Sequence, residues 1–168
     1  MKIAVIDLGT NSIRFDIYEL KDNLKAELTM IGPEVDGSLS KVKQFAKSKN
    51  ISINFTGKLS KKEWIELSEK SNIFINTTNF DNMPVSVIEA MALGLPIVST
   101  NVGGLPFLIS DNFDGVLVNR EDSDAMVDAI IKVKNDVIFK NKLVHNARTK
   151  VKNFSWKAVK PKWESLLS

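Results

Sequence analysis

Short apolar runs rich in β-branched residues recur about every 20 to 25 residues along the chain. They lie at 3–6, 27–32, 51–57, 72–77, 96–100 and 115–119. Most are continuously hydrophobic, whereas a strand with one wet face would alternate, and this is typical of strands buried on both faces of a parallel sheet. The pattern predicts about six parallel strands.

Segments with helical periodicity separate these runs. Residues that favour a helix start precede four of them: Ser38, the Ser60–Glu63 pair, Pro84 and Asp122–Ser123. Ser60 and Glu63 have the spacing of a capping box, and proline is well tolerated in a first helical turn. Alternating strands and helices predict βαβ units, and so a Rossmann-like, doubly wound α/β sheet with helices on both faces.

The composition is that of a soluble globular chain of 168 residues with 43% hydrophobic residues. There are no cysteines and one histidine, His145, so we expect no thiolate chemistry, no histidine-bound metal and no histidine-based triad. The net charge is only +3 and the lysines are scattered, which argues against nucleic acid as a partner. Peripheral contact with an anionic membrane stays open. We expect a cytoplasmic location, since no signal peptide or spanning segment is present.

The densest candidate chemistry lies in a polar loop at 77–83, which follows one strand and leads into a helix at Pro84. In a doubly wound sheet, ligands bind beyond the carboxyl ends of the strands. Free amides near Val85 and Ser86, at the positive end of the helix dipole, suit an anion. Glu89 lies about 7–8 Å further along the axis, at ~1.5 Å per residue. A nucleoside diphosphate has this reach, although Glu89 taken alone is better explained as a helix-surface glutamate.

Two neighbouring loops are weaker signals. Gly103 and Gly104 follow the next strand and allow either a close approach to a ligand or a simple turn. Lys58, Lys61 and Lys62 follow the third strand, where solvated lysines are more common than ligand-binding ones.

Taken together, these residues resemble the C-terminal domain of retaining glycosyltransferases of group 1, also called family four, which have GT-B architecture. The match is carried by "NFDNMPVSVIEAMALGLPIVSTNVGG", in which Asp81 and Glu89 take the places of the family's E-x7-E pattern. The tail "NFSWKAVKPKWESLL" is similar to the family's C-terminal helix. The resemblance covers residues 26–168.

The resemblance implies a nucleotide-sugar donor, such as a UDP- or GDP-sugar, with no other cofactor and no metal. It assigns the catalytic positions to Asp81, near the donor sugar, and Glu89, on the ribose hydroxyls. The remaining donor-binding positions that it implies are Lys58, Asn82, Pro84, Val85, Ser86, Gly103 and Gly104. The expected reaction is glycosyl transfer with retention to a glycan or lipid acceptor.

The sequence departs from the family pattern at several places. Position 81 is Asp, Asn82 replaces the usual glycine, and Phe107 stands where many members have Glu. The Gly-Arg and Lys that grip the donor diphosphate in the family have no clear counterpart in "IDLGTNSIRFD". The acceptor-binding N-terminal domain is also absent, so we expect the isolated chain to be inactive alone.

The head of the chain, "IAVIDLGTNSIRFDIYEL", resembles instead the phosphate loop of the exopolyphosphatase/guanosine pentaphosphate phosphatase family, within the actin-like ATPase fold. Its matching residues are Asp7, Gly9 and Thr10, followed by Asn11 and Ser12. We therefore divide the chain into an atypical head at 1–25, a possible fusion remnant, and a glycosyltransferase domain at 26–168. The alternative functions are an actin-like phosphatase or ATPase fragment using the Asp7–Gly9–Thr10 loop, and a noncatalytic binding module.

Overall fold

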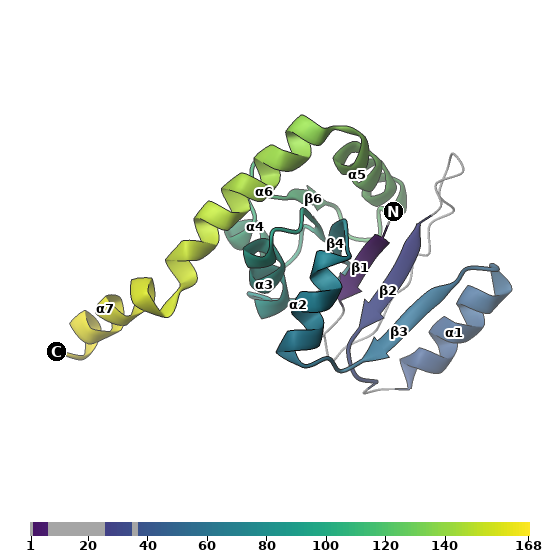
Figure 1. Ribbon diagram of the computed structural model, residues 1–168, viewed down its shortest axis with the longest axis horizontal. Coiled ribbons are helices and arrows are strands. Elements are labelled where there is room, and N and C mark those ends of the chain that lie inside the picture. Colours follow the sequence, from purple (N-terminus) through teal and green to yellow (C-terminus); the bar gives the residue numbers. More distant parts are fainter. Residues whose placement is uncertain (1, 7–25, 35–36) are drawn as a thin grey trace.

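The computed structural model describes residues 2–6, 26–34 and 37–168. The described residues form one six-stranded sheet (Figure 1). Its strands are β1 (Lys2–Ile6), β2 (Glu27–Ile31), β3 (Ile53–Gly57), β4 (Ile73–Asn76), β5 (Ile97–Thr100) and β6 (Val116–Val118). Every pairing between them is parallel, in the order β3-β2-β1-β4-β5-β6. Each predicted run therefore becomes a strand, and the predicted fold class is confirmed.

The helices are α1 (Ser38–Ser48), α2 (Lys61–Glu69), α3 (Val85–Leu93), α4 (Leu105–Leu108), α5 (Ser123–Asn135), α6 (Val137–Val151) and α7 (Trp156–Leu167), with a short 3-10 turn, η1 (Lys152–Phe154). The capping box at the start of α2 is confirmed. Ser60 Oγ accepts from Glu63 N at 3.3 Å, and Ser60 N donates to Glu63 Oε2 at 2.7 Å. Asp122 caps α5 by accepting from Ala125 N.

Alternate strand residues enter two separate apolar cores, one on each face of the sheet. Phe74 and Ile97 pack with α2 and α3 side chains such as Trp64 and Met91. Ile73 and Val98, one residue away on the same strands, pack instead with α5 side chains such as Met126 and Ile130. The protein is thus a three-layer α/β/α domain, as the sequence predicts.

The strand order reverses between β1 and β4, which lie side by side although β2 and β3 separate them in the chain. This is the topological switch point, where ligands bind in open α/β sheets. The loops that follow β3, β4 and β5 all lie at the carboxyl edge of the sheet because every strand is parallel. The candidate site residues are on these loops and on α3, the helix that follows β4.

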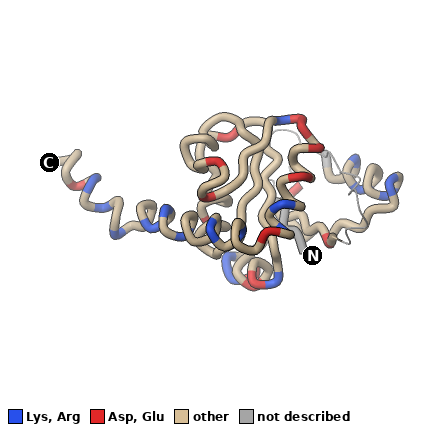
Figure 2. The backbone as a smooth tube through the Cα atoms, turned by 90° about the horizontal axis from the view of Figure 1, so that it is seen from above, with Lys and Arg blue, Asp and Glu red and all other residues tan. Residues whose placement is uncertain are grey.

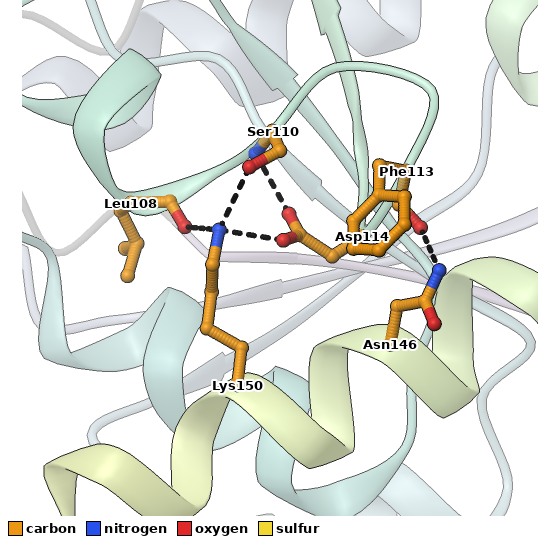
Figure 3. Close-up of polar contacts among 6 residues, drawn as sticks. All are labelled: Leu108, Ser110, Phe113, Asp114, Asn146 and Lys150. Atoms are coloured by element: carbon orange, nitrogen blue, oxygen red, sulfur yellow. Dashed lines mark hydrogen bonds and ion pairs between the residues drawn. The ribbon is translucent and has the colours of Figure 1, made fainter.

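Helix α6 is fastened to the loop between α4 and β6 by a buried ion pair (Figure 3). The Asp114 carboxylate has no exposed surface, and its Oδ2 lies 2.5 Å from Lys150 Nζ. Lys150 Nζ also donates to Leu108 O at 2.9 Å and to Ser110 Oγ at 3.1 Å. Asn146, one turn earlier, donates to Phe113 O at 2.8 Å.

Helix α7 extends away from the sheet as an arm (Figure 1). It has no buried residue, and Trp156 is 70% exposed and Trp163 54% exposed. Leu166 and Leu167 at its end are also exposed. The arm therefore presents large apolar side chains that the described part of the chain does not cover.

Candidate nucleotide site

Hydrogen bonds at the carboxyl ends of β4 and β5 fix the polar loop at 77–83. Buried Asn76 donates from Nδ2 to Ser99 Oγ at 3.2 Å, and Thr100 Oγ1 donates to Thr78 O at 2.6 Å. Thr78 Oγ1 in turn donates to Phe80 O at 3.0 Å. The loop therefore leaves the sheet in a direction set by the neighbouring strand.

The Gly103–Gly104 segment lies directly against this loop. Gly104 N donates to Asp81 O at 2.8 Å. A Cβ at Gly103 would collide with the carbonyl oxygen of Asp81, and one at Gly104 would collide with that of Asn82. Gly103 also has a positive φ of 53°. The structure thus brings Asp81, Asn82 and the two glycines together, and the glycines are required by this close backbone contact.

Helix α3 begins at Val85, so the helix starts one residue later than expected and Pro84 is its N-cap. Pro84 has an extended ψ of 117°, which keeps it outside the helix. Its carbonyl accepts from the amides of Val87 and Ile88. No partner within the described residues is recorded for the amides of Val85 and Ser86, as expected for a first helical turn without a side-chain cap.

Glu89 follows on the same helix and is only partly exposed, with 29% of its side chain accessible. Its Oε1 forms an ion pair with Lys61 Nζ from the first turn of α2. Lys61 itself is 76% exposed, and approaches Glu89 from the solvent side. Glu89 is therefore more than an isolated surface glutamate, because a second element of the fold holds it.

The other predicted positions have different surroundings. Asp81 is half-buried and Asn82 is exposed, and both contribute backbone carbonyls to the contact with the glycines. Lys58 is exposed on the loop after β3, and the ion pair to Glu89 comes instead from Lys61 in the first turn of α2. Phe107 is 86% exposed on the short helix that follows Gly104.

The head motif lies outside the described residues, so Asp7, Gly9 and Thr10 have no structural account here. Of the head, only the backbone of β1 is described, and it lies in the centre of the sheet. Across the residues with described placement, no group of three or more His, Cys, Asp or Glu side chains is arranged to hold a metal ion. In the same residues, no helix is both long and apolar enough to cross a membrane.

Sequence reasoning did not assign a role to the polar residues that orient the site. Asn76, Ser99 and Thr100 are buried polar side chains at the ends of otherwise apolar strands. A polar residue at the end of a hydrophobic run can be seen in the sequence, and it could have indicated these three positions. Lys61 gave no such signal, because its partner is 28 residues away.

A Rossmann-like sheet with an uncapped helix start, a nearby carboxylate and a tight glycine loop at its carboxyl edge is typical of nucleotide-binding α/β domains. The chain belongs to the family described as glycosyl transferases group 1, whose sequence profile matches residues 15–150. The predicted family is thereby confirmed. The comparisons give no support to the phosphatase resemblance of the head.

The relatives extend well beyond this chain. An alpha-1,4-N-acetyl-D-galactosaminyltransferase from Campylobacter jejuni, whose name specifies a PP-undecaprenol-linked glycan, is 29% identical over 99% of this chain and 46% of its own length. The structure of Anabaena HepE with UDP-glucose matches 99% of this chain and 48% of that chain, with a TM-score of 0.82 and 14% identity. The C-terminal domain of the group 1 protein LpcC from Francisella tularensis matches 80% of this chain and 72% of that chain, with a TM-score of 0.69 and 21% identity. The chain spans about half the length of the first two proteins.

Proposed function

We propose that this chain is the nucleotide-sugar-binding half of a retaining glycosyltransferase. The observation that carries the proposal is the start of α3, where two amides without a recorded partner precede the half-buried Glu89 on one helix. The diphosphate binds the amides of Val85 and Ser86, and the ribose hydroxyls bind the Glu89 carboxylate. A carboxylate is a strong acceptor for such hydroxyls.

The loops around α3 complete the site. Asp81 faces the donor sugar, and the backbone at Asn82, Gly103 and Gly104 shapes the space beside it. Lys58 and the loop after β3 flank the base. During transfer, negative charge develops on the leaving diphosphate, and fixed amide dipoles stabilise it without reorganising.

The relatives favour particular substrates. A structural neighbour was solved with UDP-glucose, and the C. jejuni relative is named for a PP-undecaprenol-linked acceptor. We accordingly propose a UDP-sugar donor, with a GDP-sugar as the other candidate, and a glycan or lipid-linked glycan as acceptor.

The acceptor-binding half is a proposed partner of this chain. The domain at 26–168 carries the donor site, and the head at 1–25 supplies β1. Two features support a missing partner: the chain covers 48% of the HepE chain, and α7 leaves Trp156 and Trp163 largely exposed. An acceptor-binding half packed on α7 would cover these side chains and close the site.

We propose a cytoplasmic location with peripheral membrane contact through the basic arm. Residues 152–168, which form η1 and the arm, contain four lysines and one glutamate. The remaining 151 residues contain 19 basic and 19 acidic residues, so the net charge of +3 lies in η1 and the arm together. Figure 2 shows the basic residues spaced along it. Binding to anionic but not to neutral vesicles, lost when the arm lysines are changed to Gln, is the expected result.

The test of the donor site is a calorimetric titration of the chain with UDP, GDP and ADP. Glu89→Gln is expected to weaken the preferred nucleotide about tenfold, in the range of a lost hydrogen bond to a charged group. The control is Glu66→Gln, on the exposed face of α2.

Unchanged binding by the Glu89 variant would contradict the proposal, and loss of binding on Asp7→Asn instead would favour the phosphate loop of the head. Sugar transfer by the isolated chain to a simple acceptor would contradict the need for a second half.

A further inference from the structure

Three lysines, Lys58, Lys61 and Lys62, lie between the end of β3 and the first turn of α2. Among the described residues, Lys61 is the one of the three with a recorded ion pair to a predicted substrate-binding side chain, Glu89. Its Nζ contacts Glu89 Oε1. The second oxygen, Oε2, has no recorded hydrogen bond within the described part of the chain, so it is available to a ligand. A carboxylate with one oxygen held and one available has a defined orientation.

The position of Lys61 is itself fixed by the start of α2. Ser60 and Glu63 form the capping box, which sets the backbone direction one residue before and two residues after Lys61. The carboxylate of Glu63 is occupied by the Ser60 amide at 2.7 Å. Lys62 points to Glu66, with 3.9 Å between Nζ and Oε1. Glu63 and Glu66 are thus engaged by other groups, and Lys61 reaches across to α3.

We propose that Lys61 is a positioning residue for ribose recognition. It holds Glu89 Oε1 and thereby presents Oε2 to the ribose hydroxyls of the incoming nucleotide. Because Lys61 is largely exposed, the pair is a weak surface ion pair, which orients the carboxylate and still adjusts when the ligand binds. This inference rests on the proposed function, in which Glu89 binds the ribose.

The ribose distinguishes this positioning role of Lys61 from a general attraction between a lysine and the phosphates of the ligand. A lysine that acts through Glu89 matters only for nucleotides with ribose hydroxyls. A lysine that attracts the diphosphate directly matters equally for nucleotides without them. The matched probes are UDP, GDP or ADP, whichever binds best, and its 2′,3′-dideoxy analogue.

The variants are Lys61→Met, Lys61→Arg and Lys62→Met, each tested by calorimetric titration of the full chain with both probes. We expect Lys61→Met to weaken the ribonucleotide about two- to fivefold, the range of an exposed ion pair, and to leave the dideoxy analogue unchanged. Lys61→Arg should restore binding, and Lys62→Met, which removes the same charge one residue away, should have no selective effect. High salt should reduce the difference between wild type and Lys61→Met.

Two results would overturn the inference: equal weakening of both probes by Lys61→Met, or no weakening of either. Failure of the proposed function would be visible separately in the wild-type chain. There, absent binding or equal affinity for the two probes would show that Glu89 does not recognise ribose, whatever Lys61 does. Melting curves of each variant check that the fold is retained, as expected for an exposed side chain.

Discussion

The amide of Gly104 donates a hydrogen bond of 2.8 Å to the carbonyl of Asp81, so the loop after β5 is joined to the loop after β4. Gly104 has an ordinary φ of −86°, within the range of any residue. What excludes a side chain there is contact, because a Cβ would meet the carbonyl oxygen of Asn82. The backbone hydrogen bond therefore joins the two loops at the site, and it can form only because residue 104 has no side chain.

Gly104→Ala is expected to separate these loops. Backbone atoms cannot move aside as a flexible side chain does, so we expect a loss of about 1–3 kcal/mol in the free energy of unfolding, together with loss of nucleotide binding. Urea denaturation and a UDP titration measure the two effects. Gly37→Ala is the matched control, since Gly37 has a positive φ of 77° but nothing within 4 Å of an added Cβ. It should cost stability while leaving binding intact, and unaltered binding by Gly104→Ala would contradict the account.

Lys150→Met is expected to destabilise the junction of α6 with the loop before β6. The change leaves the fully buried Asp114 carboxylate without its cation. Removing one partner of a buried pair typically costs about 3–5 kcal/mol, and we expect the lower end because the Lys150 side chain is 27% exposed. Chemical denaturation of the variant against wild type measures the loss.

The control for this prediction is Lys142→Met, two turns earlier on α6. Lys142 reaches Asn112 O at 3.4 Å on the exposed surface, so its removal should change the free energy of unfolding by less than about 0.5 kcal/mol. Adding Asp114→Asn to Lys150→Met should recover part of the loss, because the buried charge disappears. Equal stability of the Lys150 and Lys142 variants would contradict the importance of the ion pair.

The capping box of α2 predicts a pH dependence. Hydrogen bonding with the Ser60 side chain, and then with the Ser60 backbone, lowers the pKa of Glu63 below its ordinary value of 4.5. A carboxyl whose pKa is lowered by folding stabilises the folded state above its unfolded pKa, and this contribution is lost as the pH falls through the folded pKa. The stability difference between wild type and Glu63→Gln should therefore be constant above pH 4.5 and shrink below it.

Thermal melting of wild type and Glu63→Gln from neutral pH to about pH 3 measures this difference. Glu66→Gln, on the same helix with an exposed partner at 3.9 Å, is the control and should show a smaller effect. A difference between wild type and Glu63→Gln that grows on acidification would contradict the assignment of the capping carboxylate.

Local patterns in the sequence account for most of the fold. Six apolar runs gave six strands, and the Ser60–Glu63 and Asp122 signals marked helix starts that the structure confirms. These features depend on neighbours a few residues apart, which is the range over which periodicity and capping act. The helix start was predictable to within one residue, since Pro84 is the N-cap, and the location of Glu89 on α3 was predictable for the same reason.

The contacts that shape the site depend on pairs far apart in the sequence. Gly104 with Asp81, Thr100 with Thr78 and Lys61 with Glu89 meet only because parallel strands bring successive loops to one edge. Lys61 in isolation resembles any solvated lysine on a helix. Asp114 and Lys150 are likewise joined by tertiary packing, since α6 crosses from one face of the sheet to the other, placing Leu143 in one core and Ala147 in the other.

The central claim is that a nucleoside diphosphate binds at the start of α3, and an amide-shift titration tests it most directly. UDP, GDP and ADP are added to the isotope-labelled chain, and backbone shifts are followed residue by residue. The account predicts changes clustered at Val85, Ser86 and Glu89 and at Gly103 and Gly104, with one base preferred. Changes confined to the head around Gly9 and Thr10, or to none of these positions at millimolar nucleotide, would contradict it.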